Sequence, residues 1–436
     1  MLRKLIFGMI FIIGCSDNFL LAQDSSNKAI PQQWSLQNCL DYAKQNNITL
    51  NSLKLTAKSS EQDLIQSKAA KTPNLTGSVS QSLTNYKSGL NPSSGYGVNS
   101  SVTLYNGNYL NNDIKEKQLS LQVASLNVLS SENDITLQIT QAYLNILLAK
   151  ENIAYLQDLV TTVEAQVTQG KQRFNAGTIA QKDLLELQAT LATDKYSLVT
   201  AENTKRQYIL NLKQILQLPT DASFDITNAD SFNEKIIITP LSEVEQTALQ
   251  NRPEVKSGAL SVEIAQVAIE KAKAGLRPTL SLGGSLYTNY SKDPSYQYFN
   301  QIGNNFYQQL GVTLSVPFLD RKTTKTNVAR AQIQTSQAKL SLQSTKTVLS
   351  QSIEQAYINV LNAQSQFTAA EEQLNYTKES YRIANEQLKI GTYNIVELLQ
   401  QKNLYVQALQ SYVQAKYAAV LYNKIYNFYS GIPVTQ

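Results

Sequence analysis

The chain has 436 residues, a net charge of +5 at pH 7 and only 16% charged residues, against about 25% in a typical soluble domain. It contains no histidine and only two cysteines, Cys15 and Cys39, so it lacks the residues for a zinc cluster or a disulfide framework. The positive charge is spread without a dense Lys/Arg run and no nucleophile–base–acid set is recognisable, so nucleic acid binding, a metal, a cofactor and catalysis are not expected.

Residues 1–22 predict an export signal. Two basic residues precede an apolar core, Leu5 to Ile13, which is too short to span a membrane as a helix. Two cleavage sites are compatible with the sequence. The run 12–15 (Ile-Ile-Gly-Cys) resembles a bacterial lipobox, which would limit the signal to 1–14 and leave Cys15 lipidated, whereas 20–23 resembles an ordinary site cleaved after Ala22.

Residues 23–218 form the first of two predicted repeats. Ser35 can cap a helix that runs to about Ala70. Apolar and polar residues then alternate over 75–86 and again over 96–105, which is typical of strands with one apolar face. The stretch 87–95 is rich in turn residues, so the sequence predicts a β-hairpin over 75–105.

Two long helices follow the hairpin. The first is expected from about Asn108 to Phe174, which corresponds to roughly 100 Å at 1.5 Å per residue. Gly177 suits the left-handed position after a helix end, and Thr178 suits the N-cap of the next helix, with Gln181 placed for a capping box. The returning helix is expected to end at about Leu216.

Residues 219–240 are polar and irregular and are interpreted as a connector, with a short strand-like run at 236–238. Residues 241–436 repeat the first plan, with a helix, a hairpin over 279–318 and two long helices. The segment 291–305, rich in Tyr, Asn and Gly, is expected to be a loop between the strands of this hairpin.

An apolar seam with alternating steps of four and three residues indicates that the long helices pack as coiled coils. The seam runs from Ile135 to Phe174 and recurs from Leu349 to Leu388, 214 residues later in each case. Gly391 and Thr392 match the first helical turn at the same offset. The chain is therefore interpreted as an internal duplication.

Four strands with one apolar face are too few to close a membrane barrel, which needs eight or more. Either the strands pack on the helices as a small soluble sheet, or several chains share a barrel. Tyrosines near the expected strand ends suit an aromatic girdle at the membrane surface, and they are Tyr86, Tyr96, Tyr105, Tyr287, Tyr290, Tyr296, Tyr298 and Tyr307.

The sequence resembles the TolC family of bacterial outer-membrane efflux proteins. The resemblance rests on four stretches and on their order and spacing along nearly the whole mature chain. They are Trp34 to Ala43 (WSLQNCLDYA), Ala248 to Val255 (ALQNRPEV), Arg173 to Asp183 (RFNAGTIAQKD) and Gly391 to Leu399 (GTYNIVELL).

The resemblance implies a mainly α fold with a small β part. In such a protein, three chains share a twelve-stranded barrel in the outer membrane, and their helices continue as a tube into the periplasm. The implied partners are two further copies of the chain, outer-membrane lipid, a periplasmic membrane-fusion adaptor and an inner-membrane pump. The implied function is passive conduction of small toxic compounds or secreted proteins to the exterior.

The resemblance also implies that the helical turns at Gly177 and Gly391 are the periplasmic tips. Glu397 occupies the place of an acidic residue that narrows the entrance, and Asp183 is its counterpart in the first repeat. Three copies would form rings of like charge that attract cations. The chain departs from the family pattern in two places, with Gln400 where a second acid is common and Tyr393 where a basic gate residue is common.

Two interpretations of these carboxylates stay open, because an acid near a helix N-terminus also stabilises the helix dipole. The function has an alternative too. Pattern alone is compatible with a periplasmic coiled-coil structural protein that forms no channel.

Overall fold

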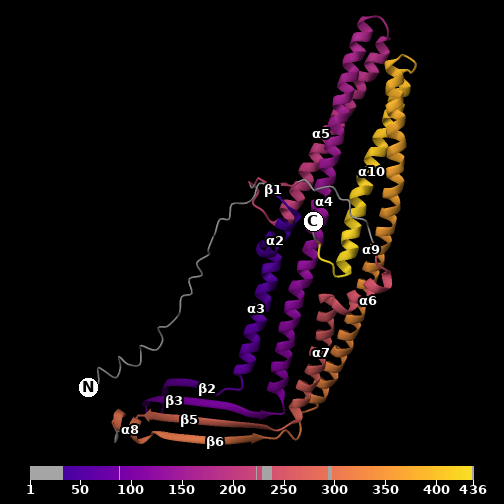
Figure 1. The fold of residues 1–436 in the computed structure, drawn as a ribbon. Coiled ribbons are helices and arrows are strands. Elements are labelled where there is room, and N and C mark those ends of the chain that lie inside the picture. Colours follow the sequence, from indigo (N-terminus) through magenta and orange to yellow (C-terminus); the bar gives the residue numbers. More distant parts are fainter. Residues whose placement is uncertain (1–32, 88, 222, 228–237, 293–296, 435–436) are drawn as a thin grey trace.

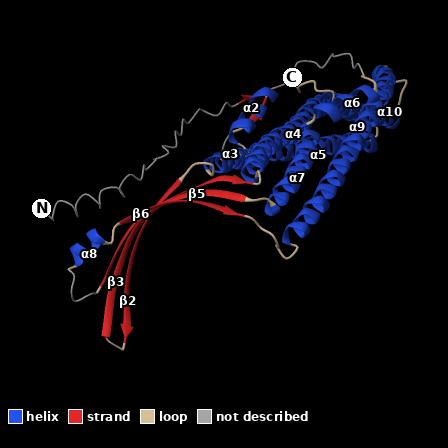
Figure 2. Ribbon diagram, turned by 90° about the horizontal axis from the view of Figure 1, so that it is seen from below, coloured by secondary structure: helices blue, strands red, loops and turns tan. Residues whose placement is uncertain are grey.

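A computed structural model describes residues 33–434 apart from 88, 222, 228–237 and 293–296. Long helices form a rod, and a four-stranded sheet lies at one end of it (Figure 1). The sheet extends to one side of the rod and does not continue along it (Figures 1 and 2). The predicted export signal, with Cys15, lies outside the described residues.

The first half begins with two helices in place of the single helix expected up to Ala70. Asn47 separates them, because its extended backbone (ψ 123°) ends the first helix and its side-chain oxygen accepts a hydrogen bond from the Leu50 amide at 3.1 Å. The elements are α2 (Leu36–Asn46), α3 (Ile48–Ala69), β2 (Asn74–Tyr86), β3 (Gly89–Asn106), α4 (Tyr109–Asn175) and α5 (Gln181–Leu216).

The second half has the same order of elements, with two additions, a 3-10 turn before its first strand and a short helix between its strands. The segment expected to be a loop between its strands holds a short helix, α8. The elements are α6 (Leu241–Asn251), α7 (Pro253–Lys273), a 3-10 turn (Ala274–Leu276), β5 (Thr279–Ser291), α8 (Tyr298–Asn304), β6 (Tyr307–Ser315), α9 (Thr323–Lys389) and α10 (Ile395–Tyr429).

The connector contains β4 (Asp225–Ile226), which pairs in parallel with β1 (Gln33–Trp34). The strand-like run expected at 236–238 is only partly described. Positions 236 and 237 lie outside the described residues, and Ile238 is not in a strand. None of the helices in the described part of the chain has the length and apolar character needed to cross a lipid bilayer.

The first hairpin is longer than expected. Residues 89–95, predicted to be a turn, belong to β3, and the chain reverses between Tyr86 and Gly89, which are paired. Gly89 has φ +107°, a conformation that only glycine adopts readily. Pro92 has no N–H to donate, and it fits in β3 because the pairing of this strand with β5 begins only at the next residue, Ser93.

The sheet order is β2-β3-β5-β6, so β2 and β6 are both open edges. The register brings the apolar positions of all four strands onto one face, because residues opposite each other in antiparallel strands point the same way. Val98 pairs with Leu286, and Leu282 pairs with Val312. The same face carries Leu75, Val79, Val102, Leu280, Leu310 and Leu314.

The tyrosines near the strand ends do not all lie on the same face of the sheet. Tyr287 and Tyr307 lie on the polar face of the sheet, with ring centroids 5.5 Å apart. By register Tyr96 lies on the apolar face, where its hydroxyl is 2.6 Å from that of Tyr298 on α8. Successive strand residues point to opposite faces, so the position of each tyrosine in its strand decides which face it lies on. Tyr296 lies outside the described residues.

The helices pack through the predicted seam. Its buried members in α4 include Ile139, Ile146 and Val163, and those in α9 include Ile353 and Val360. Each fully buried side chain of this size contributes about 1.5–3 kcal/mol. Near the middle of the rod the seam residues of α4 belong to a core around Trp34 and Cys39, and those of α9 belong to a second core around Val244 and Tyr426. Burial raises the pKa of the Cys39 thiol to about 12, so it acts as a small core residue.

Candidate entrance site at the helical tips

The two turns between long helices lie together at the end of the rod farthest from the sheet (Figure 1). In the first turn, the amide of Gly177 donates to the carbonyl of Phe174 at 2.9 Å, and the amide of Thr178 donates to that of Arg173 at 2.9 Å. This is a Schellman motif, which requires a left-handed residue after the helix. Gly177 has φ +70° and provides that residue.

The second turn repeats the motif. The amide of Gly391 donates to Leu388 at 3.2 Å, and the amide of Thr392 donates to Gln387 at 3.0 Å. Gly391 has φ +80°. The two turns are therefore equivalent in backbone geometry.

The sequence suggested that Thr178 caps the next helix, but the structure shows that it does not. Its hydroxyl donates to the carbonyl of Arg173 at 2.9 Å and so closes the preceding helix. The N-cap position of α5 is Ala180, which moves Gln181 out of any capping box and places Asp183 at the third helical residue. The cap was misplaced because two residues, Thr178 and Ile179, separate the left-handed glycine from the N-cap, whereas the N-cap was expected directly after the glycine.

The two candidate carboxylates differ in their surroundings. Asp183 is half-buried, and its carboxylate accepts a hydrogen bond from the Ala180 amide at 3.4 Å. Glu397 is exposed; its amide donates to Asn394 Oδ1 at 2.8 Å, so Asn394 caps α10. Among the contacts of the described residues, none engages the Glu397 carboxylate. This favours a capping role for Asp183 and leaves Glu397 free to face a solute.

Arg173 connects the two tips. Its guanidinium donates to the carbonyl of Leu388 at 3.4 Å and to that of Lys389 at 3.3 Å, at the C-terminus of α9. A cation is favourable there because the helix dipole and the unpaired carbonyls are negative. The second tip has the half-buried Tyr393 where a basic gate residue was expected from the family pattern. The basic residue that links the two hairpins is instead Arg173, near the first tip.

Further polar contacts join the α4–α5 hairpin to the α9–α10 hairpin inside the rod. Gln166 on α4 donates to Tyr381 at 3.2 Å and to Asn385 at 3.3 Å, both on α9. Lys402 on α10 forms an ion pair with Asp194 on α5, and the Lys402 side chain is only 1% exposed. These contacts hold the four helices of one chain together over the part of the rod nearest the tips.

A second ion pair lies closer to the middle of the rod. The Lys416 ammonium on α10 is 2.9 Å from the Glu151 carboxylate on α4. Burial and this carboxylate raise the pKa of Tyr155 to about 12, so the phenol stays protonated and donates to Glu151 at 3.2 Å.

The inter-hairpin residues were missed from the sequence, although a signal was present. Asp194 interrupts an apolar seam between Leu191 and Leu198, and Lys402 interrupts one between Leu398 and Tyr405. A charged residue in a seam position predicts a buried partner. The partner itself, 208 residues away, could not be read from spacing.

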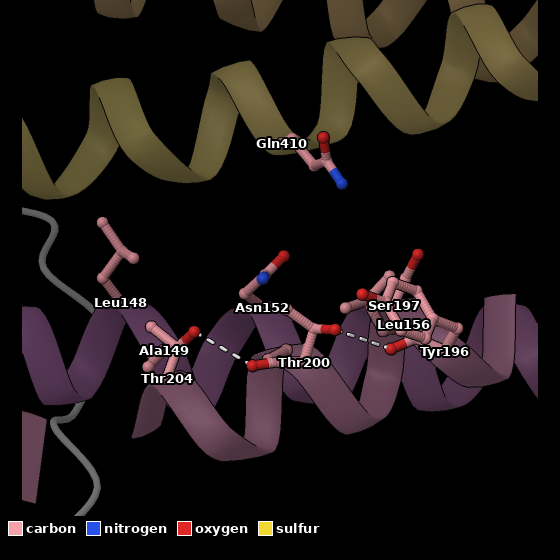
Figure 3. A pocket seen from close by; sticks show the side chains of 10 residues that line it. Leu148, Ala149, Asn152, Leu156, Tyr196, Ser197, Thr200, Thr204 and Gln410 are labelled. Atoms are coloured by element: carbon pink, nitrogen blue, oxygen red, sulfur yellow. Dashed lines mark hydrogen bonds between the residues drawn. The ribbon is translucent and has the colours of Figure 1, made fainter. Parts of the chain in front are cut away.

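A shallow groove of about 280 Å³ lies between α4, α5 and α10, with Gln410 on one side and side chains of the other two helices on the other (Figure 3). Thr200 and Thr204 line it, but their hydroxyls bond to carbonyls of their own helix at 2.9 Å. Apolar side chains and satisfied hydroxyls suit helix packing better than chemistry. No group of three His, Cys, Asp or Glu side chains that could hold a metal ion occurs among the described residues.

The duplicated long hairpins, the one-sided sheet at one end and the paired turns at the other define a fold class of paired helical hairpins joined to a small antiparallel sheet. The family described as "Outer membrane efflux protein" matches residues 39–217 and 244–421, which is most of the chain. The chain therefore belongs to the outer membrane efflux protein family. This membership places it in the bacterial outer membrane, and the family is one of transport proteins.

Individual relatives are distant. The chain is 25% identical over 293 residues to toxin and drug export protein A of Aggregatibacter actinomycetemcomitans, covering 66% of this chain and 61% of that protein. It is 24% identical over 315 residues to TolC of Escherichia coli K12, covering 70% and 62%. The match thus spans about three fifths of the length of these relatives.

Solved structures support the fold. A structure of CusC, described in connection with conformational changes in folding and channel formation, aligns with TM-score 0.79 at 15% identity, covering 91% of each chain. The Campylobacter jejuni CmeC outer membrane channel aligns with TM-score 0.76 at 19% identity, covering 92% of this chain and 87% of that one. The predicted fold class, mainly α with a small β part, is confirmed.

Proposed function

We propose that three copies of this chain form a channel that passively conducts small toxic compounds or secreted proteins across the outer membrane. The observation that supports this best is the sheet. It has one apolar face and two open edges, β2 and β6, and an open edge within a bilayer leaves backbone groups without hydrogen bonds. Pairing β2 of one copy with β6 of the next removes every edge, and three sheets of four strands exceed the eight-strand minimum.

The helices would continue this barrel as a tube. At 1.5 Å per residue, the 67 residues of α4 or α9 extend for roughly 100 Å. Their buried residues follow the narrow seam, and the remaining faces are largely polar apart from scattered exposed apolar side chains such as Leu129, Ile333 and Leu340. Largely polar faces suit a ring of helices around water.

Assembly in this form would require the sheet to rotate relative to the rod, because the sheet of a single chain points to one side. The junction after β3 and the junction after β6 carry left-handed residues, and these short turns are where the backbone would adjust. Between β6 and α9, the irregular residues 316–320 precede the left-handed pair and add a further place for adjustment.

The proposed partners are a periplasmic adaptor and an inner-membrane pump. One relative is a toxin and drug export protein and one structural neighbour is an outer membrane channel, and export through a passive channel needs an energy source in the inner membrane. We propose that the chain itself catalyses no reaction and that the pump selects the cargo.

The entrance would lie at the tips, where three copies of Glu397 form an acidic ring. The carboxylate is exposed and lies in the first turn of α10. Three like charges around an axis lower the energy of cations and raise that of anions in the opening. Asp183, engaged at the start of α5, would contribute less.

Conductance of the purified protein in planar bilayers tests both parts of the proposal. Wild type should form cation-selective channels, and Glu397→Gln should weaken the selectivity. Glu386→Gln is a matched control, because that exposed carboxylate lies near the same tip but is paired with Lys389 at 2.8 Å. Equal selectivity in all three proteins would contradict the proposed acidic ring and leave the proposed channel intact. A soluble, non-conducting product would instead favour the periplasmic coiled-coil alternative.

A further inference from the structure

The junctions between helices and strands are strongly basic. The four segments 68–73, 106–109, 274–278 and 316–325 contain only one acid, Asp320, against six cations, which are Lys68, Lys71, Arg277, Arg321, Lys322 and Lys325. The Asp320 carboxylate accepts a hydrogen bond from the Thr324 amide at 2.7 Å and so caps α9. Arg277 donates to the Gly107 carbonyl at 2.9 Å. Arg321 and Lys322 are exposed and form no ion pair within the described part of the chain.

Arg321 and Lys322 occupy an unusual backbone conformation. Their φ angles are +53° and +65°, in the left-handed region that crowds any side chain with a Cβ. The positions 214 residues earlier are Gly107 and Asn108, with φ +66° and +70°. Glycine and asparagine are the residues that suit this conformation. The turn can therefore be made without charge, and the second repeat has two cations there despite the steric penalty.

Exposed apolar side chains lie next to these cations. Phe318 is 88% exposed and Leu319 is 95% exposed. Both lie in the segment that follows the end of β6 at Ser315. Leu276, 54% exposed, belongs to the junction before β5. The two junctions are in close contact at Gly275, where an added Cβ would lie only 2.6 Å from the Thr324 hydroxyl at the start of α9. We call the surface formed by Leu276, Phe318, Leu319, Arg321 and Lys322 the junction patch.

We propose that the junction patch binds anionic phospholipids of the membrane leaflet on the helical side of the barrel. Arg321 and Lys322 contact the lipid phosphates, and Phe318 and Leu319 insert at the boundary between headgroups and acyl chains. This inference rests on the proposed membrane barrel. Unpaired cations beside exposed apolar groups complement a phospholipid, which presents phosphate and hydrocarbon in the same order. Phe318 and Leu319 also follow β6 closely in the chain, and the exposed Leu310, Val312 and Leu314 of that strand lie on the apolar face of the sheet.

Fluorescence quenching by lipids with brominated acyl chains tests the position of the patch. The chain has one tryptophan, Trp34, which is 2% exposed in the helical core, so wild type supplies a low background. In vesicles of phosphatidylethanolamine and brominated phosphatidylglycerol, Phe318→Trp should be quenched. Leu310→Trp, on the apolar face of β6, reports on the barrel itself.

These two variants separate the possible failures. Quenching of Leu310→Trp without quenching of Phe318→Trp would mean that protein, such as a neighbouring copy, covers the patch, and it would overturn the proposal while keeping the barrel. Absence of quenching in both would overturn the proposed membrane function as well.

A second experiment tests the cations. The variant Arg321→Gly/Lys322→Asn copies the first junction into the second, so it removes both charges and relieves the backbone strain without endangering folding. Its preference for phosphatidylglycerol over phosphatidylcholine should fall about fivefold for each cation removed, and the loss should shrink at high salt. Lys171→Gln/Lys378→Gln, which removes two exposed lysines from α4 and α9, is the control. An unchanged lipid preference in the junction variant would overturn the proposal.

Discussion

The ammonium of Lys402 on α10 and the carboxylate of Asp194 on α5 form an ion pair inside the helical rod. Their side chains are 1% and 12% exposed, and they belong to hairpins from different repeats. Taking two charges out of water is costly, so such a pair stabilises the fold only while both partners are present. Within the described part of the chain it is the most deeply buried of the ionic contacts that join the two hairpins, the other being Lys416–Glu151.

Removing one partner should therefore be more harmful than removing both. We expect Lys402→Met to lower the free energy of unfolding by about 3–5 kcal/mol, because the Asp194 carboxylate stays buried without a counter-ion. The double variant Lys402→Met/Asp194→Leu should recover most of that loss. Chemical denaturation of the detergent-purified protein, followed by circular dichroism, measures both. A double variant that is no more stable than Lys402→Met would show that the pair is not the cause.

Arg173 should hold the two tips together. In Arg173→Gln the charge-assisted hydrogen bonds to the C-terminus of α9 are lost, which removes about 1–2 kcal/mol of contact between the hairpins. If the protein is a channel, its conductance in planar bilayers should rise, and Arg173→Lys should have an intermediate effect. Arg382→Gln is the control, because that exposed guanidinium pairs only within its own helix, with Glu379 at 2.7 Å. Equal effects of Arg173→Gln and Arg382→Gln would contradict the proposed link.

The tip turn should be sensitive to a single methyl group. Gly391 has φ +80° and nothing lies within 4 Å of a Cβ built on it, so Gly391→Ala should cost about 1–2 kcal/mol from backbone strain alone. Gly303→Ala is a matched control, since that site is equally open and has no positive φ. Thermal unfolding should distinguish them, and an equal shift in both variants would mean that the left-handed turn adapts.

Acid should weaken the sheet-side end of the rod. There Lys271 on α7 lies 2.7 Å from Asp113 and 2.9 Å from Glu116, both on α4. Burial opposes ionisation of Asp113, but hydrogen bonds from Lys271 and Ser67 outweigh it and lower the pKa of this carboxyl below its ordinary value. A depressed pKa means that the contribution to stability is complete above the unfolded-state pKa, near 4, and is lost as the pH falls through the folded-state value.

We therefore expect wild type to lose stability below about pH 4, and we expect Asp113→Asn to be less stable at neutral pH and to show a smaller change on acidification. Denaturation midpoints measured across this range test the effect. Parallel curves for the two proteins would rule out Asp113 as the titrating group.

Local signals in the sequence predicted most of the elements. The seam from Ile135 to Phe174 predicted a helix of unusual length, because a period near 3.5 residues is legible over many turns. The left-handed glycines at 177 and 391 were predicted because few other residues adopt that conformation. The break at Asn47 and the N-cap at Ala180 were missed, since single residues at helix ends carry weak and competing signals.

The candidate site was predicted only in part. Glu397 and Asp183 have the same place in two repeats and look equivalent in the sequence, yet the structure engages one carboxylate in capping and leaves the other exposed. The contacts from Arg173 to Leu388 and from Lys402 to Asp194 were not predictable, because they join residues more than 200 positions apart.

The sequence by itself determined the duplication, the long helices, the two hairpins and the positions of the tip turns, because each depends on the periodicity or conformational preference of nearby residues. Only the tertiary structure decided which strands are neighbours, which face collects the apolar side chains, and which charges meet inside the rod. Those outcomes depend on contacts between distant segments, where burial and register, and not local preference, select the partner.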